Sequence, residues 1–314
     1  MEEALYSQFG FFNTDLVRSA KKGDFLTSPE VSIYFGKILR NWINTSCNLN
    51  KIVEIGSGTG SLIEQIGIKE ITAIELSSTA REELINKGIM THTNVNELTL
   101  EKSELVFGNE ILDNVPCSIG IYRDKVWYEK VVAIQENSFS YDIKPIRNEE
   151  LDWINKNNIV PNEDHELEIQ VNIDKFLNTV IKKISPKNIL LFDYGYEQAN
   201  REKRKYNSFL RTYKNHHLSV DPIEDPGNID ITYDVNFSSL SRELKTLGYD
   251  VTLKLQRNFL LENGFDIIFD ELQEKYLVAD GMEKLKINSE LNGLKAIVDS
   301  NGLGGFYCLN AQKL

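Results

Sequence analysis

The sequence predicts an α/β fold, in which a Rossmann-like sheet carries helices on both faces and an antiparallel β-meander with its own helices is inserted. Short β-branched runs alternate with helical segments through roughly the first hundred residues, which is typical of a parallel sheet. A glycine-rich turn follows the first of these runs. Near the middle of the chain, a series of strand-like runs bounded by turn residues interrupts the alternation.

The composition indicates a globular protein with a sizeable core, because 41% of the 314 residues are hydrophobic and 10% are aromatic. No apolar run approaches the ~20 residues that span a bilayer. The N-terminus, MEEALYSQFGFF, has neither a basic signal-peptide region nor an Arg-rich transit sequence. The three cysteines are widely spaced, which fits a reducing compartment. We therefore predict a cytoplasmic protein without a membrane segment.

The first clear helix is predicted directly after the motif GDFLTSPE. Ser28 is expected to cap this helix, Pro29 suits its first turn, and apolar residues recur at helical spacing over 31–42. Buried strands and further helices then alternate, and Gly88 is expected to end the last of these helices. The predicted parallel strands are 51–55, 71–77, 103–109 and 188–193, and the predicted helices are 61–67 and 78–88.

The middle and the end of the chain break this alternation. Strand-like runs predict an antiparallel meander over 118–146. Helices are expected at 149–158 and 172–184, and the acidic segment 161–168 between them is expected to be a loop. The polar stretch 196–236 is expected to be a long irregular loop, a kind of segment that is often functional. The C-terminal part is predicted to contain helices at 238–248 and 282–299 and strands at 250–256 and 305–311.

These elements predict three regions around one core rather than two separate domains. Residues 1–116 are expected to form the N-terminal segment and the ligand-binding half of the core, and 117–187 the inserted meander and helices. Residues 188–314 are expected to complete the core and to carry the loop at 196–236. A split near the midpoint would cut the core, because strands from both halves belong to the same sheet.

The junction between the first strand and the next helix, GSGTG, is the strongest local signal. Gly56, Gly58 and Gly60 let the backbone approach a ligand, and the following helix offers free amide groups to it. Glu75 ends the second strand 19 positions after Gly56, where a carboxylate can bind ribose hydroxyls. NAD or FAD would require G-x-G-x-x-G. The observed G-x-G-x-G, preceded by Glu54, is instead the pattern of S-adenosylmethionine (SAM) sites, so SAM is favoured over either dinucleotide.

Several further motifs occur in the order in which one enzyme family has them. The chain contains ALYSQFGFF near its start, GDFLTSPE at 23–30, NEILDNVP at 109–116, DYG at 193–195 and DPIEDPGNIDITYDVNF at 221–237. With the glycine loop, they resemble the MidA-like family of class I methyltransferases over nearly the whole chain. The glycine loop is common to most class I methyltransferases, whereas GDFLTSPE and NEILDNVP are much more specific.

The resemblance implies a class I methyltransferase sheet that binds SAM, with the inserted region as a substrate module. Mitochondrial members of the family help assemble respiratory complex I and methylate arginine on a partner subunit. The family often has an acidic residue after the third strand for the adenine amino group, where this chain has Asn94 or Asn96. The residues predicted to bind SAM are Gly23, Asp24, Thr27, Glu54, Gly56, Ser57, Gly58, Gly60, Glu75, Asn94 and Asn109.

Carboxylates after the fourth strand are the candidate catalytic residues. Methyl transfer is an in-line displacement, so alignment of acceptor and methyl group supplies much of the catalysis. A guanidinium acceptor also needs carboxylates that bind its charge. Glu110 and Asp113 follow the strand at the sheet edge where ligands bind, although Asp113 could instead cap a short helix and Glu110 bind only backbone. Tyr194 is expected on the substrate side, or packed against the sheet.

His216 and His217 raise the question of a metal. Adjacent histidines point in different directions, and the four histidines of the chain form no ligand pattern with cysteine, so no metal is expected. The two histidines are placed on the substrate side instead. The basic and aromatic run at 201–211 is similar to single-strand nucleic-acid sites, but the net charge of −12 argues against nucleic acid. A solvated helix face or a contact with an acidic protein is favoured.

The sequence thus predicts a SAM-dependent methyltransferase that acts on a protein side chain, with arginine favoured and a respiratory-complex subunit as a candidate partner. A second hypothesis is an assembly factor that acts mainly by binding its partner on a methyltransferase fold. A third is a methyltransferase for a small molecule or RNA. The sequence leaves the oligomeric state open.

Overall fold

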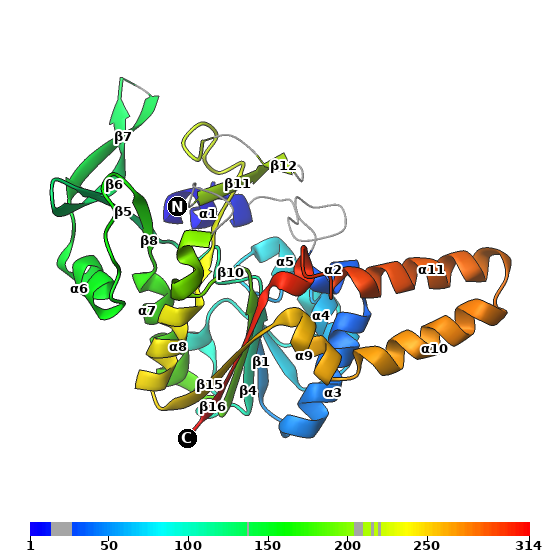
Figure 1. The fold of residues 1–314 in the computed structure, drawn as a ribbon. Coiled ribbons are helices and arrows are strands. Elements are labelled where there is room, and N and C mark those ends of the chain that lie inside the picture. Colours follow the sequence, from blue (N-terminus) through cyan, green and yellow to red (C-terminus); the bar gives the residue numbers. More distant parts are fainter. Residues whose placement is uncertain (14–26, 137, 204–209, 215–216, 219–220) are drawn as a thin grey trace.

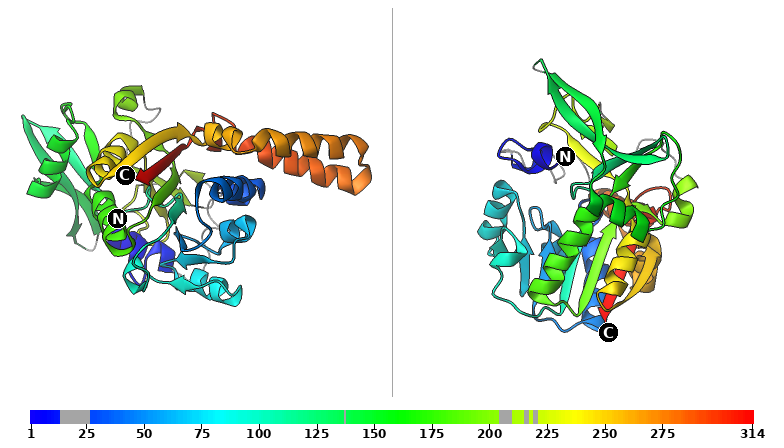
Figure 2. Two further views of the ribbon diagram at one scale, coloured as in Figure 1. Left: turned by 90° about the horizontal axis from the view of Figure 1, so that it is seen from below. Right: turned by 90° about the vertical axis from the view of Figure 1, so that its left-hand side faces the viewer.

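A central sheet lies between two layers of helices, and a smaller sheet stands to one side of it (Figure 1). The computed structural model describes residues 1–13, 27–136, 138–203, 210–214, 217–218 and 221–314. A pair of long helices projects from the side opposite to the smaller sheet, as Figure 1 and the left-hand view of Figure 2 show. This arrangement confirms the predicted α/β fold with helices on both faces of the sheet.

The central sheet is parallel over most of its width. In spatial order its strands are β15 (Tyr249–Leu255), β16 (Tyr307–Lys313), β9 (Asn188–Asp193), β4 (Leu105–Asn109), β1 (Ile52–Ile55), β2 (Ile71–Ile74) and β3 (Thr91–His92). All neighbours from β9 to β3 are parallel, whereas β16 is antiparallel to β9 and to β15. The carboxyl ends of β4, β1 and β2 therefore meet at one edge of the sheet, where ligands bind in such folds.

Alternate residues of each strand cover the two faces with apolar side chains. On one face, Phe107 and Phe192 join a core with the first group of helices, and the rings of Phe35 and Phe192 lie 5.2 Å apart. On the other face, Leu191 packs against the second group. The first group is α3 (Tyr34–Ser46), α4 (Ser61–Ile66), α5 (Ser78–Asn86), α9 (Gln256–Glu262), α10 (Phe265–Val278) and α11 (Gly281–Ala296), and the second is α7 (Val171–Ile184) and α8 (Phe237–Thr246).

The start of the first predicted helix differs from the expectation. A short helix, α2 (Ser28–Val31), comes first and ends before α3 begins. Thr27 caps α2, and the carboxylate of Glu30 accepts a hydrogen bond from the Thr27 amide at 3.0 Å. Ser28, the predicted cap, is buried instead, and its hydroxyl accepts a hydrogen bond from Gln256 Nε2 at 3.0 Å. The prediction was wrong because it could not include this distant partner.

The inserted region forms a separate antiparallel sheet whose outer strands are β7 and β8. Its strand order is β7 (Ser138–Pro145), β6 (Val126–Gln135), β5 (Ser118–Arg123) and β8 (Glu166–Ile169), and α6 (Asn148–Lys156) packs on it. The meander was predicted, but β8 occupies part of the predicted acidic loop at 161–168. Leu167 and Ile169 of β8 are buried against Trp153, and this tertiary contact outweighs the acidic composition of the segment.

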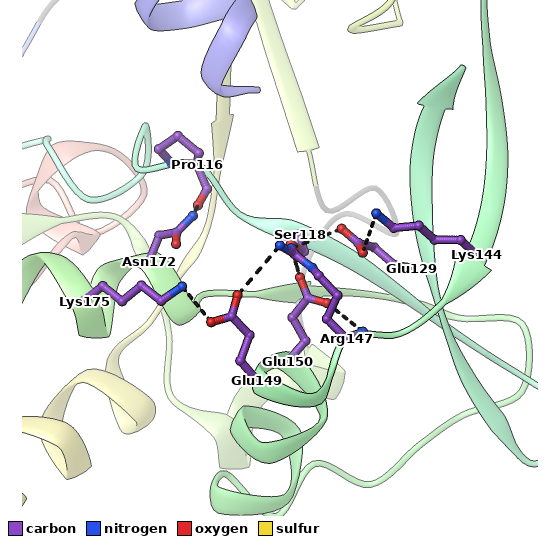
Figure 3. A network of polar contacts seen from close by, with 9 residues as sticks. All are labelled: Pro116, Ser118, Glu129, Lys144, Arg147, Glu149, Glu150, Asn172 and Lys175. Carbon is purple, nitrogen blue, oxygen red and sulfur yellow. Dashed lines mark hydrogen bonds and ion pairs between the residues drawn. The ribbon is translucent and has the colours of Figure 1, made fainter. Parts of the chain in front are cut away.

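Arg147 joins several parts of this region (Figure 3). Its guanidinium donates hydrogen bonds to Ser118 Oγ at 2.9 Å and Glu129 Oε1 at 3.2 Å, and it pairs with Glu150, which is 1% exposed. On α7, Asn172 Nδ2 donates to the carbonyl of Pro116 at 2.8 Å. The Arg147 contacts thus hold α6 against the inserted sheet, and the Asn172 contact holds α7 against the loop after β4.

Residues 196–236 contain short strands and are not the irregular loop that was predicted. They form two small sheets, because β11 pairs with both β12 and β13, and β10 pairs with β14. Ile231 and Tyr233 are fully buried, so the polar composition of this stretch concealed a buried strand. The elements are β10 (Gly195–Tyr196), η3 (Gln198–Lys203), β11 (Leu210–Lys214), β12 (His217–Leu218), β13 (Asp230–Tyr233) and β14 (Val235–Asn236).

The C-terminal part contains two helices that the sequence analysis missed, α9 and α10. The predicted helices and strands there are confirmed as α8, α11, β15 and β16, with ends shifted by a few residues. The remaining elements are α1 (Glu2–Tyr6), η1 (Phe11–Asn13), η2 (Val95–Glu97) and η4 (Leu303–Gly305). Among the described helices, none combines the length and the hydropathy needed to cross a membrane.

Candidate functional site

A cavity of about 620 Å³ opens at the carboxyl ends of β1, β2 and β4. The glycine loop, the start of α5 and the loop after β4 form its walls, and α1 and η1 contribute residues from above the sheet edge. Many of the predicted site residues share this cavity. Those that line it are Thr27, Glu54, Gly56, Ser57, Gly58, Glu75, Asn94, Asn109 and Glu110.

The glycine loop has a conformation that ordinary side chains rarely adopt. Gly56 and Gly58 have φ angles of +69° and +52°. A Cβ atom on Gly56 would lie 2.4 Å from Cγ2 of Ile111, so only glycine fits beside the loop after β4. The Gly56 amide donates a hydrogen bond to the Ile74 carbonyl at 2.8 Å, which ties the loop to β2.

Glu75 connects the glycine loop to the next helix. Its carboxylate accepts hydrogen bonds from the Gly58 amide and from the Ser77 amide, each at 2.8 Å. Burial raises the pKa of Glu75 above its ordinary value, and the two amides oppose this shift. The carboxylate is thus held at the position where such sites bind ribose hydroxyls.

Gly60 does not line the cavity, although the sequence analysis placed it among the ligand contacts. Its φ is +82°, and a Cβ atom there would lie 2.6 Å from Cδ2 of Leu84 on α5. The residue caps α4 and allows α4 and α5 to pack closely. The third glycine of the motif therefore serves packing in this structure.

Glu54 lines the cavity as a buried acid, and one of its two carboxylate oxygens lacks a partner among the described residues. The residue is 2% exposed, and its Oε2 atom has no hydrogen-bond partner among the described residues. Burial raises its pKa well above the ordinary value. A buried polar atom without a partner is costly, which indicates that a ligand donor completes this site. The ammonium group of SAM is a donor of the required kind.

Glu110 lines the cavity and is held in a strained backbone conformation. Its φ is +52°, and its amide donates to the Phe192 carbonyl at 2.8 Å. Oε1 accepts hydrogen bonds from Asn109 Nδ2 at 3.0 Å and from the Ser28 amide at 3.4 Å. Burial and the nearby Asp113 carboxylate raise the pKa of Glu110 to about 8. A strained backbone and a side-chain pKa shifted from its ordinary value are both features of functional sites.

Asp113 and Tyr194 lie behind the cavity wall rather than in it. The Tyr194 hydroxyl donates to Asp113 Oδ2, and the Arg211 guanidinium lies 4.6 Å from the Tyr194 ring. Burial raises the pKa of Asp113 to about 6, and the Tyr194 hydrogen bond opposes the shift. Asp113, predicted as a catalytic residue, is therefore placed to support the loop that carries Glu110.

Asp193 is a structural residue that the sequence analysis did not select. Its Oδ2 atom accepts hydrogen bonds from the amides of Ile111, Leu112 and Asp113 at 3.1, 2.8 and 3.3 Å. The side chain thus braces the turn that follows Glu110. The DYG motif was the available signal, because a fully buried aspartate at a strand end needs several donors.

Replacing Asp193 with alanine is expected to lower the free energy of unfolding by about 2–4 kcal/mol, because the three amides of the turn after Glu110 and the Tyr194 amide lose their acceptor. Urea unfolding measures the change. Asp250→Ala on β15 is the matched control, because Asp250 is exposed, and its expected change is below about 0.5 kcal/mol. Equal stability of the two variants would contradict the bracing role.

Several predicted residues are not placed in the cavity. Gly23, Asp24 and His216 lie outside the described residues, and His217 belongs to β12.

Asn94, by contrast, lines the cavity and caps η2, where its Oδ1 accepts a hydrogen bond from the Asn96 amide at 3.0 Å. The described residues contain no group of three or more His, Cys, Asp or Glu side chains that could hold a metal ion.

The charge of the lining distinguishes between the ligands that the sequence left open. Among the described residues that line the cavity, five are glutamates and none is Lys, Arg or His. In their ionised form these carboxylates repel the pyrophosphate of a dinucleotide and attract the positive charges of SAM. The acids are Glu2, Glu30, Glu54, Glu75 and Glu110.

Comparisons with known proteins agree with this geometry. The profile of a family of S-adenosyl-L-methionine-dependent methyltransferases matches residues 36–253. A Caenorhabditis elegans protein named protein arginine methyltransferase NDUFAF7 homolog, mitochondrial, is 25% identical over 83% of this chain and 70% of its own length. The protein arginine methyltransferase NDUFAF7, mitochondrial, of Rattus norvegicus is 25% identical over 81% of this chain and 67% of its own length.

Two crystal structures from Burkholderia thailandensis share the fold over 99% of this chain. One holds S-adenosyl-homocysteine and matches with a TM-score of 0.85 and 23% identity over 86% of that protein. The other, a native structure of an uncharacterized protein, matches with a TM-score of 0.81 and 23% identity over 85% of its length. At this identity the matches show the fold.

Proposed function

We propose that this chain, which belongs to the MidA-like family of S-adenosyl-L-methionine-dependent methyltransferases, methylates arginine side chains of a protein. The observation that carries the proposal is the cavity lining, in which glutamates are the only charged residues among those described. Such a lining binds both a cationic cofactor and a cationic acceptor. The names of the curated relatives support the same acceptor.

The residues on the β2 side of the cavity are proposed to hold the cofactor. Glu75 would bind the ribose, the amides of the glycine loop would lie against the amino-acid part, and Glu54 would accept from the ammonium group. Asn94 would lie beside the adenine. When bound, SAM supplies a methyl group on a sulfonium, which is a good leaving group.

Glu110 is proposed to bind and orient the acceptor. Its ionised carboxylate would form charge-assisted hydrogen bonds with a guanidinium and hold one nitrogen toward the methyl group. Because its pKa is raised to about 8, the same carboxylate can take the proton that the methylated nitrogen releases. Asp113, which accepts a hydrogen bond from Tyr194, would act as a positioning residue by supporting the loop that carries Glu110.

The inserted region at 117–187 and the segment at 196–236 are proposed to contact the protein substrate. Asn172 of the first bonds to Pro116 and Tyr233 of the second bonds to Val115, both in the loop after β4. His216 and His217 belong to the second segment. The net charge of −12 supports a basic protein segment rather than RNA as substrate. A respiratory-complex subunit is the finer proposal for the partner. We keep the cytoplasm as the predicted compartment, although the names of the relatives place those proteins in mitochondria.

Incubation with methyl-labelled SAM and a cell lysate tests the proposal. We expect label in protein, and acid hydrolysis of that protein should release methylated arginine. Label confined to RNA or small molecules would overturn the proposed acceptor. Absence of SAM binding by the folded protein, measured by calorimetry beside S-adenosylhomocysteine and NAD, would contradict the cofactor assignment.

The pH dependence of the reaction is expected to follow Glu110. Its ionised form binds the acceptor, so kcat/KM should rise with pH and level off above about pH 8, where the pKa of about 8 has been passed. Between about pH 5 and 8, Glu110 keeps its proton in the folded protein but has lost it in the unfolded chain. The free energy of unfolding is therefore expected to fall as the pH rises through this range. A kcat/KM profile that is flat between about pH 6 and 9 would contradict the role of Glu110.

A further inference from the structure

The first residues of the chain fold over the cavity as a short hook. We define the N-terminal hook as residues 1–13, which comprise α1 and η1. In Figure 1 α1 lies beside β11, above the carboxyl edge of the central sheet. Glu2, Tyr6 and Phe12 of the hook line the cavity. The sequence analysis assigned no site role to the residues of this segment.

The hook is fixed to β13 by buried contacts. Leu5 and Phe11 form a buried cluster with Ile229 and Ile231. Gly227 has a φ of +90°, and a Cβ atom there would lie 2.7 Å from the Phe9 carbonyl oxygen. The motif DPGNIDI therefore provides the surface on which the hook rests.

Two aromatic rings of the hook form a rigid roof over the cavity. The Tyr6 and Phe12 rings are stacked, with centroids 5.5 Å apart and an interplanar angle of 22°. Phe11 meets Phe12 edge to face at 5.2 Å. The Tyr6 hydroxyl donates a hydrogen bond to the Asn114 carbonyl at 3.1 Å. We call Tyr6 and Phe12 the aromatic roof.

The order of strands in the sheet places this roof at the acceptor end of the cavity. β4 lies between β9 and β1, whereas β2 and β3 lie on the other side of β1. Glu75, after β2, and Asn94, after β3, mark the nucleoside end. Asn114 follows β4, close to Glu110, and it is the residue to which the roof is bonded.

We propose that the aromatic roof, together with Glu2 and Glu110, is a subsite that recognises the acceptor as a planar cation. Aromatic faces attract cations, and a flat guanidinium also stacks on them, which a neutral group of the same shape does less well. The two carboxylates add charge-assisted hydrogen bonds at the edge of the cation. This inference rests on the proposed function, since it assumes that the acceptor enters from the β4 side.

Binding of small probes to protein saturated with S-adenosylhomocysteine tests the subsite. Ethylguanidinium and N-ethylurea have nearly the same shape and differ in charge, so ligand-observed NMR titrations with both isolate recognition of the cation. We expect ethylguanidinium to bind more tightly than N-ethylurea. Phe12→Leu should weaken ethylguanidinium binding about 3- to 30-fold, as expected for loss of a cation–π contact. The affinity for S-adenosylhomocysteine should stay within about twofold, because leucine keeps an apolar side chain at position 12 and leaves the Tyr6 bond to Asn114 in place.

Phe9→Leu is the matched control, because Phe9 belongs to the same hook but is 79% exposed and does not line the cavity. Phe12→Tyr keeps an aromatic face and should retain binding. Equal affinity of the two probes, or equal loss in Phe9→Leu and Phe12→Leu, would overturn the subsite. If Phe12→Leu binds normally while wild-type protein still forms methylarginine, the subsite fails and the proposed function stands. If the wild-type protein neither formed methylarginine nor bound SAM, the proposed function itself would be refuted.

Discussion

Glu110→Gln is expected to lower the rate of methyl transfer to the protein acceptor by at least about 100-fold while SAM binds almost as before. The amide keeps the hydrogen bond from the Ser28 backbone but has neither the charge that attracts a guanidinium nor the capacity to take its proton. Single-turnover transfer from labelled SAM measures the rate, and calorimetry measures the affinity for SAM.

Glu82→Gln provides the control for this variant. Glu82 lies on α5, is exposed and does not line the cavity, so its replacement removes one negative charge without touching the site. We expect unchanged transfer in this control. If Glu110→Gln lost SAM affinity and transfer to the same extent, Glu110 would belong to the cofactor side of the cavity and not to the acceptor side.

Gly58→Arg is expected to abolish SAM binding and, with it, all methyl transfer. Gly58 lines the cavity with a φ of +52°, and its amide is bonded to Glu75. An arginine side chain there would fill the cavity and pair with its glutamates, and the left-handed backbone adds about 1–2 kcal/mol of strain. Calorimetry with SAM should show no heat of binding.

Gly88→Arg separates the backbone effect from the blocked cavity. Gly88 also has a positive φ, +75°, but a Cβ atom there would meet nothing within 4 Å. The two variants should therefore lose similar stability, and only Gly58→Arg should lose SAM. Gly58→Arg also distinguishes the enzyme from an assembly factor, because partner function that survived in it would contradict the catalytic interpretation.

The sequence predicted the cavity lining beside β1 and β2 better than the lining beside β4. Glu54, Gly56, Gly58 and Glu75 lie within about twenty residues of one another, and two adjacent strands bring them together. Strand, turn and helix signals are local, so the pattern alone placed them. Gly60 shows the limit of that reasoning, because its packing against Leu84 depends on where α5 lies.

The part of the cavity beside β4 depends on residues that are far apart in the chain. Tyr6 reaches Asn114, 108 positions away, and Asp193 accepts from the Ile111 amide, 82 positions away. No local sequence pattern encodes such pairs. The motifs that contain these residues could be recognised in the sequence, but their contacts could not be predicted from it. The raised pKa of Glu110 has the same origin, since burial by surrounding segments produces it.

The sequence by itself determined the α/β core, the glycine loop and the family, because alternation of apolar residues and the need for glycine at positive φ act over a few residues. Only the tertiary structure decided that Asp113 supports the site from behind, that β8 and β13 replace predicted loops, and that the N-terminal hook covers the cavity. The physical reason is the burial of apolar side chains that are distant in sequence. Leu5 and Ile231, for example, pack in one buried cluster although most of the chain separates them.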